Sequence, residues 1–407
     1  MNSVAFKTTS TLPVLDHAND DGVFAQMGAL RFDIIRDEAS FMELAPLWDT
    51  LLEQSAARSP FLRWDWVSLW WAEYRDTFDL AIGVVHNVWH QPVAIAPLVI
   101  GRDDSGAQRF VRQLAFIGGM GDIASQRLNF IIPRGQEAVL APMLCRIFNS
   151  IRSHWDMVRF SGIHEDSPNL PFILEALQKC SHGAGVLNRH PSRFVKLPES
   201  WLEYEMTHSG SWRSKMRRKW KAMEQEQKGR TLLAGMDDMS DEAMQTLATL
   251  HANRFPEGVS EFLGERSQRF HRRLAERWIP QGRVVLPSIE IGGKTAAMMH
   301  GFIEGDLFFQ YQMGWDPQFA DISIGALVMA WSMKCAMARG VRHYDTLPGE
   351  FNYKCQWCPG VRHTVDIEAF NLRSVSGTIF RGLRAVKRLT SGVEKNNGEL
   401  ETQTNES

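Results

Sequence analysis

The segment of residues 309–357 constrains the fold of this 407-residue chain more than any other part. A β-like run ends at Gly314, and apolar residues at helical spacing fill residues 323–339. A second β-like run, residues 341–347, follows the helix and leads into a polar turn. This order of strand, helix and strand predicts an α/β unit.

The start of the predicted helix, Ser323-Ile324-Gly325, is a candidate anion site. Helix N-termini present unpaired N–H groups and a partial positive charge, which suit a phosphate or pyrophosphate. Gly325 would let such a group approach the backbone closely. Ser323 is equally suited to be an ordinary N-cap, so simple capping is the alternative.

The turn after the second strand gathers polar and aromatic side chains, namely Asp345, Glu350, Tyr353, Lys354 and Trp357. Open α/β sheets usually hold ligands where a buried strand ends. A simple connecting loop rarely carries so many reactive side chains, so the turn is predicted to be functional.

Composition bounds the remaining possibilities. The length suggests two or three domains, and the hydrophobic (44%) and charged (23%) fractions are those of folded globular proteins. A net charge of −2 gives no whole-protein attraction to nucleic acid. We find neither a signal-peptide pattern nor an apolar run long enough to span a bilayer, and we therefore expect a cytoplasmic protein.

The five cysteines are not spaced like a secreted disulfide framework. Cys355 and Cys358 form a C-x-x-C pair, but no second pair has the spacing of a structural zinc site. We therefore expect no metal.

Hydrophobic periodicity predicts similar element orders in the two halves of the chain. In the first half we expect helices at 38–53, 61–74, 136–152 and 170–180, and strands at 80–88, 93–100, 110–117, 127–132 and 155–160. In the second half we expect helices at 211–228, 239–253, 265–278 and 323–339, and strands at 283–291, 294–303, 307–314 and 341–347.

Each half thus has a β-meander, a helix and a strand, which predicts a duplicated α/β unit, unless common elements coincide by chance. The expected divisions are a disordered tail at 1–28, a first domain at 29–200, a second domain at 201–372, and a C-terminal helix with a disordered tail at 373–407.

The pattern GWDPQFADISIG…ARGVRHYDTLPGEFNYKCQW resembles the C-terminal part of bacterial GNAT acetyltransferases associated with cellulose biosynthesis, called CelD or BioF2-like. It is more distantly similar to the Fem aminoacyltransferases, which duplicate the GNAT fold. The resemblance covers roughly residues 30–370 and is most specific at 309–357. It implies an α/β (α+β mixed sheet) protein with two tandem GNAT copies. The donor loop departs from the usual GNAT signature because it has a single glycine.

The resemblance implies that acetyl-CoA or another acyl-CoA is the donor and that Ile322, Ser323, Ile324 and Gly325 bind it. Asp345 or Glu350 would be the general base, because a carboxylate of raised pKa can accept a proton near neutrality. Tyr353 would protonate the leaving thiolate. Lys354 would hold an anionic group of the donor or acceptor, or offset charge near the oxyanion. The alternative is that Asp345 and Lys354 form a structural salt bridge.

We expect the acceptor to meet Arg254, His300, Tyr311 and Trp357. His300 lies within a β-like run, where a core histidine is the alternative. Arg254 ends the motif LHANRF, where solvent exposure is equally compatible. The acceptor would be a small molecule or a saccharide with an amine or hydroxyl group.

Three functions follow. The first is an acyl-CoA-dependent acyltransferase, with exopolysaccharide or cell-envelope metabolism as its setting. The second is a Fem-like aminoacyltransferase, in which the basic segment 213–221 would meet tRNA phosphates, although a solvated helix face explains such charge equally. The third is a catalytically degenerate GNAT-fold assembly or regulatory protein.

Overall fold

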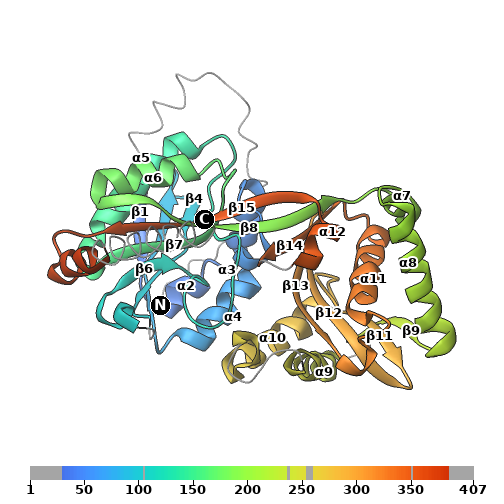
Figure 1. The fold of residues 1–407 in the computed structure, drawn as a ribbon. Helices are drawn as coiled ribbons and strands as arrows, with labels where there is room; N and C mark the ends of the chain where they lie inside the picture. Colours follow the sequence, from blue (N-terminus) through green and yellow to red (C-terminus); the bar gives the residue numbers. More distant parts are fainter. Residues whose placement is uncertain (1–29, 104–105, 236–238, 254–259, 350–351, 385–407) are drawn as a thin grey trace, which may run out of the picture.

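The computed structural model describes residues 30–103, 106–235, 239–253, 260–349 and 352–384. Its centre is a twelve-stranded mixed sheet that runs through both halves of the chain (Figure 1). The first half contains β1 (Arg31–Ile35), α2 (Glu38–Met42), α3 (Ala45–Gln54), α4 (Trp64–Tyr74), β2 (Asp79–Leu80), β3 (Ile82–His86), β4 (Pro92–Ala96), β5 (Leu98–Gly101), β6 (Gln113–Phe116), α5 (Glu137–Ser150), β7 (Met157–His164), α6 (Leu170–Cys180) and β8 (His182–Lys196).

The second half contains the elements of the predicted functional segment. They are α7 (Trp201–Met206), α8 (Gly210–Lys221), β9 (Arg230–Leu233), α9 (Ser240–Ala252), α10 (Glu265–Trp278), β10 (Val284–Val285), β11 (Pro287–Ile291), β12 (Lys294–Glu304), β13 (Leu307–Trp315), α11 (Ile324–Ala338), β14 (His343–Pro348), α12 (Asn352–Trp357) and β15 (Gly360–Phe370). A further helix covers residues 375–384.

The strand order shows that the two halves share one architecture. The large sheet runs β2-β5-β6-β7-β15-β8-β14-β13-β12-β11-β9, with β10 also paired to β12, and β1, β3 and β4 form a separate small sheet. In each half one parallel pair is joined through a helix: α5 connects β6 to β7, and α11 connects β13 to β14. Parallel strands require such a crossover. The predicted mixed α/β sheet with a duplicated unit is therefore confirmed.

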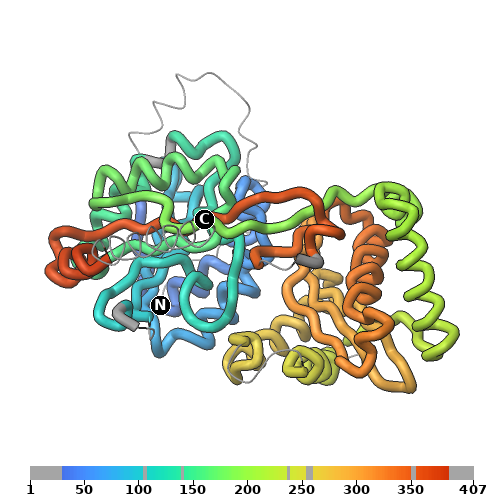
Figure 2. Tube along the Cα trace, viewed as in Figure 1, coloured from blue at the N-terminus to red at the C-terminus, as the bar shows by residue number. Residues whose placement is uncertain are grey.

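Two long strands join the halves at the middle of the sheet. β8 comes from the first half and pairs with β14 of the second, whereas β15 comes from the second half and pairs with β7 of the first. β8 and β15 also pair with each other in antiparallel orientation, and their traces cross the molecule side by side in Figure 2. The predicted domain boundary at residues 200/201 lies just after β8. The large sheet nevertheless continues from one half of the chain to the other.

The predicted helices and strands are found with local differences. The helix expected at 38–53 is divided into α2 and α3, because Pro46 lacks the N–H that a continuous helix would need and instead occupies the first turn of α3. The strand expected at 127–132 is wrong. Arg127 has a φ of 55°, and the segment makes only an isolated bridge at Ile131, while Phe130 is buried without a strand ladder.

Aromatic side chains from the two halves pack against each other in one shared core. The ring of Trp66 on α4 lies 4.8 Å from that of Phe270 on α10 and 5.5 Å from that of Phe302 on β12. Large aromatic rings bury much apolar area, so these contacts stabilise the association of the halves.

A buried ion cluster crosses the same interface. The Glu304 carboxylate on β12 accepts hydrogen bonds from Arg63 of the first half, from Arg283 at 3.0 Å and from Arg58 at 3.3 Å. Although burial alone would raise it, these hydrogen bonds and charges, led by those of Arg63, lower the pKa of Glu304.

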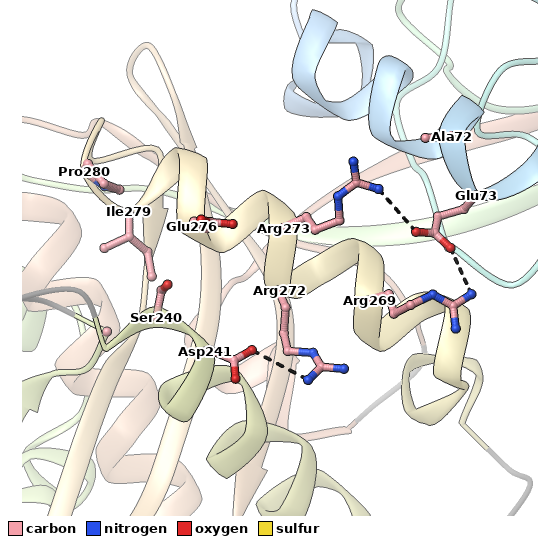
Figure 3. Close-up of a pocket in the computed structure, with 11 residues that line it drawn as sticks. Ala72, Glu73, Ser240, Asp241, Arg269, Arg272, Arg273, Glu276, Ile279 and Pro280 are labelled. Atoms are coloured by element: carbon pink, nitrogen blue, oxygen red, sulfur yellow. Dashed lines mark hydrogen bonds and ion pairs between the residues drawn. The ribbon is translucent and has the colours of Figure 1, made fainter.

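A second group of ion pairs lies in an open groove of about 1190 Å³ between α4, α9 and α10 (Figure 3). Arg269 and Arg273 both reach Glu73 of α4, and Arg272 pairs with Asp241 at the start of α9. The ion pairs of Arg269 and Arg273 with Glu73 therefore connect the two halves across this groove.

Candidate functional site

The candidate site lies where β13 and β14 separate. The two strands pair in parallel only from Leu307 to Phe309, opposite His343 to Asp345. Beyond that point β13 continues along β12, and β14 follows β8. The polar residues predicted from the sequence follow this divergence, which agrees with the expectation that ligands bind where strands of an α/β sheet end.

The start of α11 follows β13 after a loop of residues 316–323, which contains a short 3-10 turn at Pro317–Phe319. Ser323 has a left-handed conformation with a φ of 56° and makes no side-chain cap, so the cap-only interpretation of this serine does not hold. A Cβ on Gly325 would lie 3.2 Å from the indole Nε1 of Trp315. Gly325 therefore has a packing role beside Trp315, in addition to any role toward a ligand.

The side chains around this start differ in exposure. Ile324 is fully buried and belongs to the core beneath α11, whereas Ile322 and Ser323 are partly exposed. The helix start is thus anchored by Ile324 and accessible at the two residues before it.

Asp345 is held by groups from three parts of the chain. Its carboxylate forms an ion pair with Arg127 of the first half, accepts a hydrogen bond from Ser192 of β8 at 2.6 Å, and accepts one from the N–H of Leu347 at 2.8 Å. Both carboxylate oxygens are therefore engaged. The alternative from the sequence paired Asp345 with Lys354, whereas the ion pair found for Asp345 is with Arg127.

Lys354 reaches the same strand end from α12. Its Nζ donates to the carbonyl oxygens of Thr346 at 3.0 Å and Leu347 at 3.4 Å. Leu347 has a φ of 56°, so Lys354 and Asp345 together support an unusual backbone turn. Burial lowers the pKa of Lys354 to about 8, and the negative charge of Asp345 opposes that shift.

The predicted acceptor residues Tyr311 and His300 lie on the face of the sheet that α9 and α10 cover. The Tyr311 hydroxyl donates to the carbonyl of Ala124 at 2.9 Å and lies 3.2 Å from Nε2 of His271. His300 packs 5.5 Å from the ring of Tyr311, and both of its ring nitrogens are buried with no hydrogen-bond partner in the described structure. Burial lowers the pKa of His300 to about 3, so the ring is neutral.

The other predicted residues are less informative. Trp357 is buried in the core, with its ring 5.3 Å from Trp212. Tyr353 lies in α12, but its side chain falls outside the described residues. Glu350 and Arg254 also lie outside the described residues. The segment 352–357, expected to be part of a loop, is instead helix α12. This helix brings the Nζ of Lys354 within hydrogen-bond distance of the Thr346 carbonyl on β14.

Sequence reasoning missed Arg127, Ser192 and His271. Arg127 belongs to the first half and Ser192 to β8, whereas every site residue predicted from the sequence lies in the second half of the chain. The glycine-rich segment 118–127 was the available signal, since it combines three glycines with polar residues and carries both Ala124 and Arg127. Nothing in the sequence near Ser192 singles it out.

The segment that contains these residues is similar to a known protein family. Residues 210–355 match the family model described as Acetyltransferase (GNAT) domain, and they contain β13, α11, β14 and most of α12. This segment is therefore similar to a GNAT acetyltransferase domain. No curated protein sequence matches the chain.

Two solved structures show a similar fold. A crystal structure of FemX has a TM-score of 0.57 at 9% identity and covers 83% of this chain and 97% of its own. A conserved protein of unknown function from Bacteroides thetaiotaomicron VPI-5482 has a TM-score of 0.50 at 11% identity, over 84% of this chain and 100% of its own. At such identities they support the duplicated GNAT fold alone.

Two further features bear on ligands and membranes. Among the described residues, we find no group of three or more His, Cys, Asp or Glu side chains arranged to hold a metal ion. Within the same ranges, no helix has the length and apolar character to cross a membrane.

Proposed function

We propose that the protein is an acyltransferase that moves an acetyl or other acyl group from coenzyme A to an amine or hydroxyl acceptor. The observation that carries this proposal is the divergence of β13 and β14 within the segment that matches the GNAT domain. The backbone N–H groups at Ile322, Ile324 and Gly325 would bind the donor's pyrophosphate, and Ser323, whose own N–H donates to the carbonyl of Ala320 at 2.8 Å, would shape the turn that presents them. Exopolysaccharide or cell-envelope metabolism is the setting that the sequence resemblance suggests.

The reaction requires a nucleophile that loses a proton, a stabilised oxyanion and a protonated thiolate. We assign Asp345 a positioning role, because Arg127, Ser192 and the N–H of Leu347 already engage its oxygens. Glu350 then remains as the general base. Lys354, in its protonated form, would stabilise the oxyanion that forms when the acceptor attacks the thioester carbonyl.

The leaving thiolate completes the step. When the tetrahedral intermediate collapses, the carbon–sulfur bond breaks and the acyl group stays on the acceptor. Tyr353 would donate its proton to the departing sulfur. Tyr311 and His300 would line the acceptor side, where the neutral imidazole of His300 suits an uncharged group.

The experiment is a thermal-shift and turnover series with acetyl-CoA, longer acyl-CoAs and free coenzyme A. A ligand that binds the folded form raises the unfolding temperature, and the shift grows with the logarithm of its concentration above Kd. We expect Lys354→Met and Tyr353→Phe to lose turnover while keeping donor binding. Wild-type turnover in both variants, or no shift with any coenzyme A ester, would contradict the proposal.

A Fem-like function has one structural observation in its favour. On α8 the basic side chains of Lys215, Arg217, Arg218 and Lys221 are all exposed. Trp212, however, stacks on His208 with ring centroids 4.0 Å apart, so it is not free to stack on a base. Retention of tRNA at physiological salt, lost on reversing the charges of Arg217 and Arg218, would favour this function over coenzyme A-dependent transfer.

A further inference from the structure

An open cavity of about 450 Å³ lies where several strands of the first half of the chain begin or end. Its lining comes from residues in or next to β1, β2, β5, β6 and β7, and none of them belongs to the candidate site. β1 and β6 lie at the left of Figure 1, whereas α11 lies at the right. We call it the arginine cavity after its charged and titratable side chains, which are those of Arg36, Arg102, Arg112, His154 and Asp79.

Two of the three arginines are not neutralised by a neighbour. Arg36 and Arg102 are exposed, and in the described part of the chain neither side chain has an ion pair or a hydrogen bond. Arg112 is instead fixed by Asp156, whose carboxylate oxygens lie 3.1 Å from its Nη2 and 3.3 Å from its Nε. Asp79 is the one carboxylate among the described residues of the lining. Two unpaired guanidinium groups therefore share the cavity with a single unpaired carboxylate.

The positive charge of the cavity acts on His154. Burial is the largest cause that lowers the pKa of its imidazole, and the charges of Arg36 and Arg112 lower it further. Asp79 raises the pKa of His154, but it is the smallest of these four influences. Positive charge therefore dominates beside the imidazole, although a carboxylate is present.

The groove in Figure 3 offers a comparison within the same chain. It also contains three arginines, but each is paired with a carboxylate, Arg269 and Arg273 with Glu73, and Arg272 with Asp241. Charges that cancel within the protein exert little attraction on an anion in solution, whereas a cavity with uncancelled positive charge concentrates anions. The arginine cavity is of the second kind.

We propose that the arginine cavity binds a phosphate monoester that carries hydroxyl groups, which is the chemistry of a sugar phosphate. A phosphate monoester has a charge of about −1.5 to −2 at pH 7 and three acceptor oxygens. Guanidinium groups present planar forks of N–H donors that match phosphate oxygens, so Arg36, Arg102 and Arg112 would bind the same group. A carboxylate has one charge and two oxygens, and it would satisfy fewer of these donors.

The remaining lining suits the hydroxyl groups of such a ligand. The cavity volume of about 450 Å³ lies within the range of small-molecule sites, about 300–1,000 Å³, and exceeds what a phosphate group alone needs. Asp79 would repel the phosphate but accept hydrogen bonds from hydroxyl groups, and the hydroxyl of Thr77 would add a donor and an acceptor. The lining thus divides into a cationic part and a hydrogen-bonding part.

Isothermal titration calorimetry of the full chain tests the proposal with three probes, namely glucose-6-phosphate, inorganic phosphate and glucose. We expect saturable binding of glucose-6-phosphate and roughly tenfold weaker binding of inorganic phosphate, because inorganic phosphate has no second group to reach Asp79. Glucose should not bind detectably. No binding of glucose-6-phosphate would overturn the proposal, and equal affinity for the two phosphates would overturn its sugar-ester part.

Substitutions locate the contact. Arg36→Gln and Arg102→Gln should each weaken glucose-6-phosphate binding on the order of tenfold, because each removes hydrogen bonds between charged groups. The matched control is Arg272→Gln in the groove of Figure 3, where the arginine is paired with Asp241, and this variant should bind like the parent. Equal weakening by all three substitutions would indicate unspecific attraction to positive charge and would contradict the site. Circular dichroism and acyl transfer should stay unchanged in all three, so this proposal and the proposed function can fail separately.

His154 gives a readout from inside the cavity. The resonance of its imidazole C2 proton, assigned by its loss in His154→Gln, follows the protonation of the ring. Bound phosphate would place negative charge beside the ring and favour its protonated form, so saturation with glucose-6-phosphate should raise the pKa of His154. A pKa of His154 that does not change on saturation would place the ligand elsewhere and overturn the proposal.

Discussion

Replacing Glu304 with glutamine should destabilise the protein more than any surface charge substitution. The change removes the negative charge that Arg63, Arg283 and Arg58 share. Breaking a buried ion pair by removing one partner costs about 3–5 kcal/mol, because the remaining charge stays buried. Arg63 keeps a second carboxylate, Glu53, at 3.0 Å, so we expect the lower end, about 3 kcal/mol.

Equilibrium urea unfolding followed by circular dichroism measures this effect. With an m-value of about 3 kcal/mol/M, a loss of about 3 kcal/mol lowers the midpoint by about 1 M. Glu290→Gln is the matched control, because Glu290 pairs bidentately with Arg230 at an exposed site, where ion pairs contribute little to stability. A Glu304→Gln midpoint equal to that of Glu290→Gln would refute the reasoning.

The pH dependence gives an independent check. The pKa of Glu304 is lower in the folded protein than its ordinary value of 4.5, so the unfolded chain binds the proton more readily. The stabilisation that ionised Glu304 provides is therefore present above about pH 4.5, and it is lost as pH falls through the pKa of Glu304 in the folded protein. The difference between Glu304→Gln and the parent should shrink in acid. Replacing Arg63 and Glu304 together by methionine and leucine should recover most of the loss.

Three further predictions concern the candidate site. If the protonated form of Lys354 stabilises the oxyanion, kcat/KM should fall as pH rises through about 8. Lys354→Met should lower kcat about 10²–10³-fold and remove this fall of kcat/KM above pH 8. An unchanged pH profile in the variant would contradict the role. Gly314→Ala should destabilise the protein by about 1–3 kcal/mol, because its Cβ would lie 2.6 Å from the backbone N of His251 in α9. The control Gly293→Ala, whose Cβ would have nothing within 4 Å, should cost only the strain of its positive φ. Equal unfolding midpoints of the two variants in urea would refute the packing argument. His300→Leu should leave stability unchanged or raise it by about 1 kcal/mol, because it removes two buried unpaired nitrogens, and it should raise KM for the acceptor if His300 lines that side; a large loss of stability would reveal an unseen partner.

The sequence alone predicted most of the elements and the segment that carries the candidate site. Strand β13, helix α11 and strand β14 were readable because their periodicity is local: apolar side chains recur along the element that they form. The same holds for the duplication, which follows from the order of such elements. Ser323 and Asp345 were predicted as candidates for the same reason, since Ser323 begins the helical run and Asp345 stands near the end of the second β-like run.

The tertiary structure decided what surrounds those residues. The ion pair between Arg127 and Asp345 joins positions 218 residues apart, and no local pattern can encode such a partner. The exchange of β8 and β15 between the halves is also nonlocal, because the pairing of a strand depends on which edges the rest of the fold leaves open. Lys354 was expected in a loop but lies on helix α12. Its Nζ donates to the carbonyl of Thr346 on strand β14, a contact between two elements that no local pattern predicts. Local periodicity specifies elements, whereas the contacts between them exist only once the chain has closed on itself.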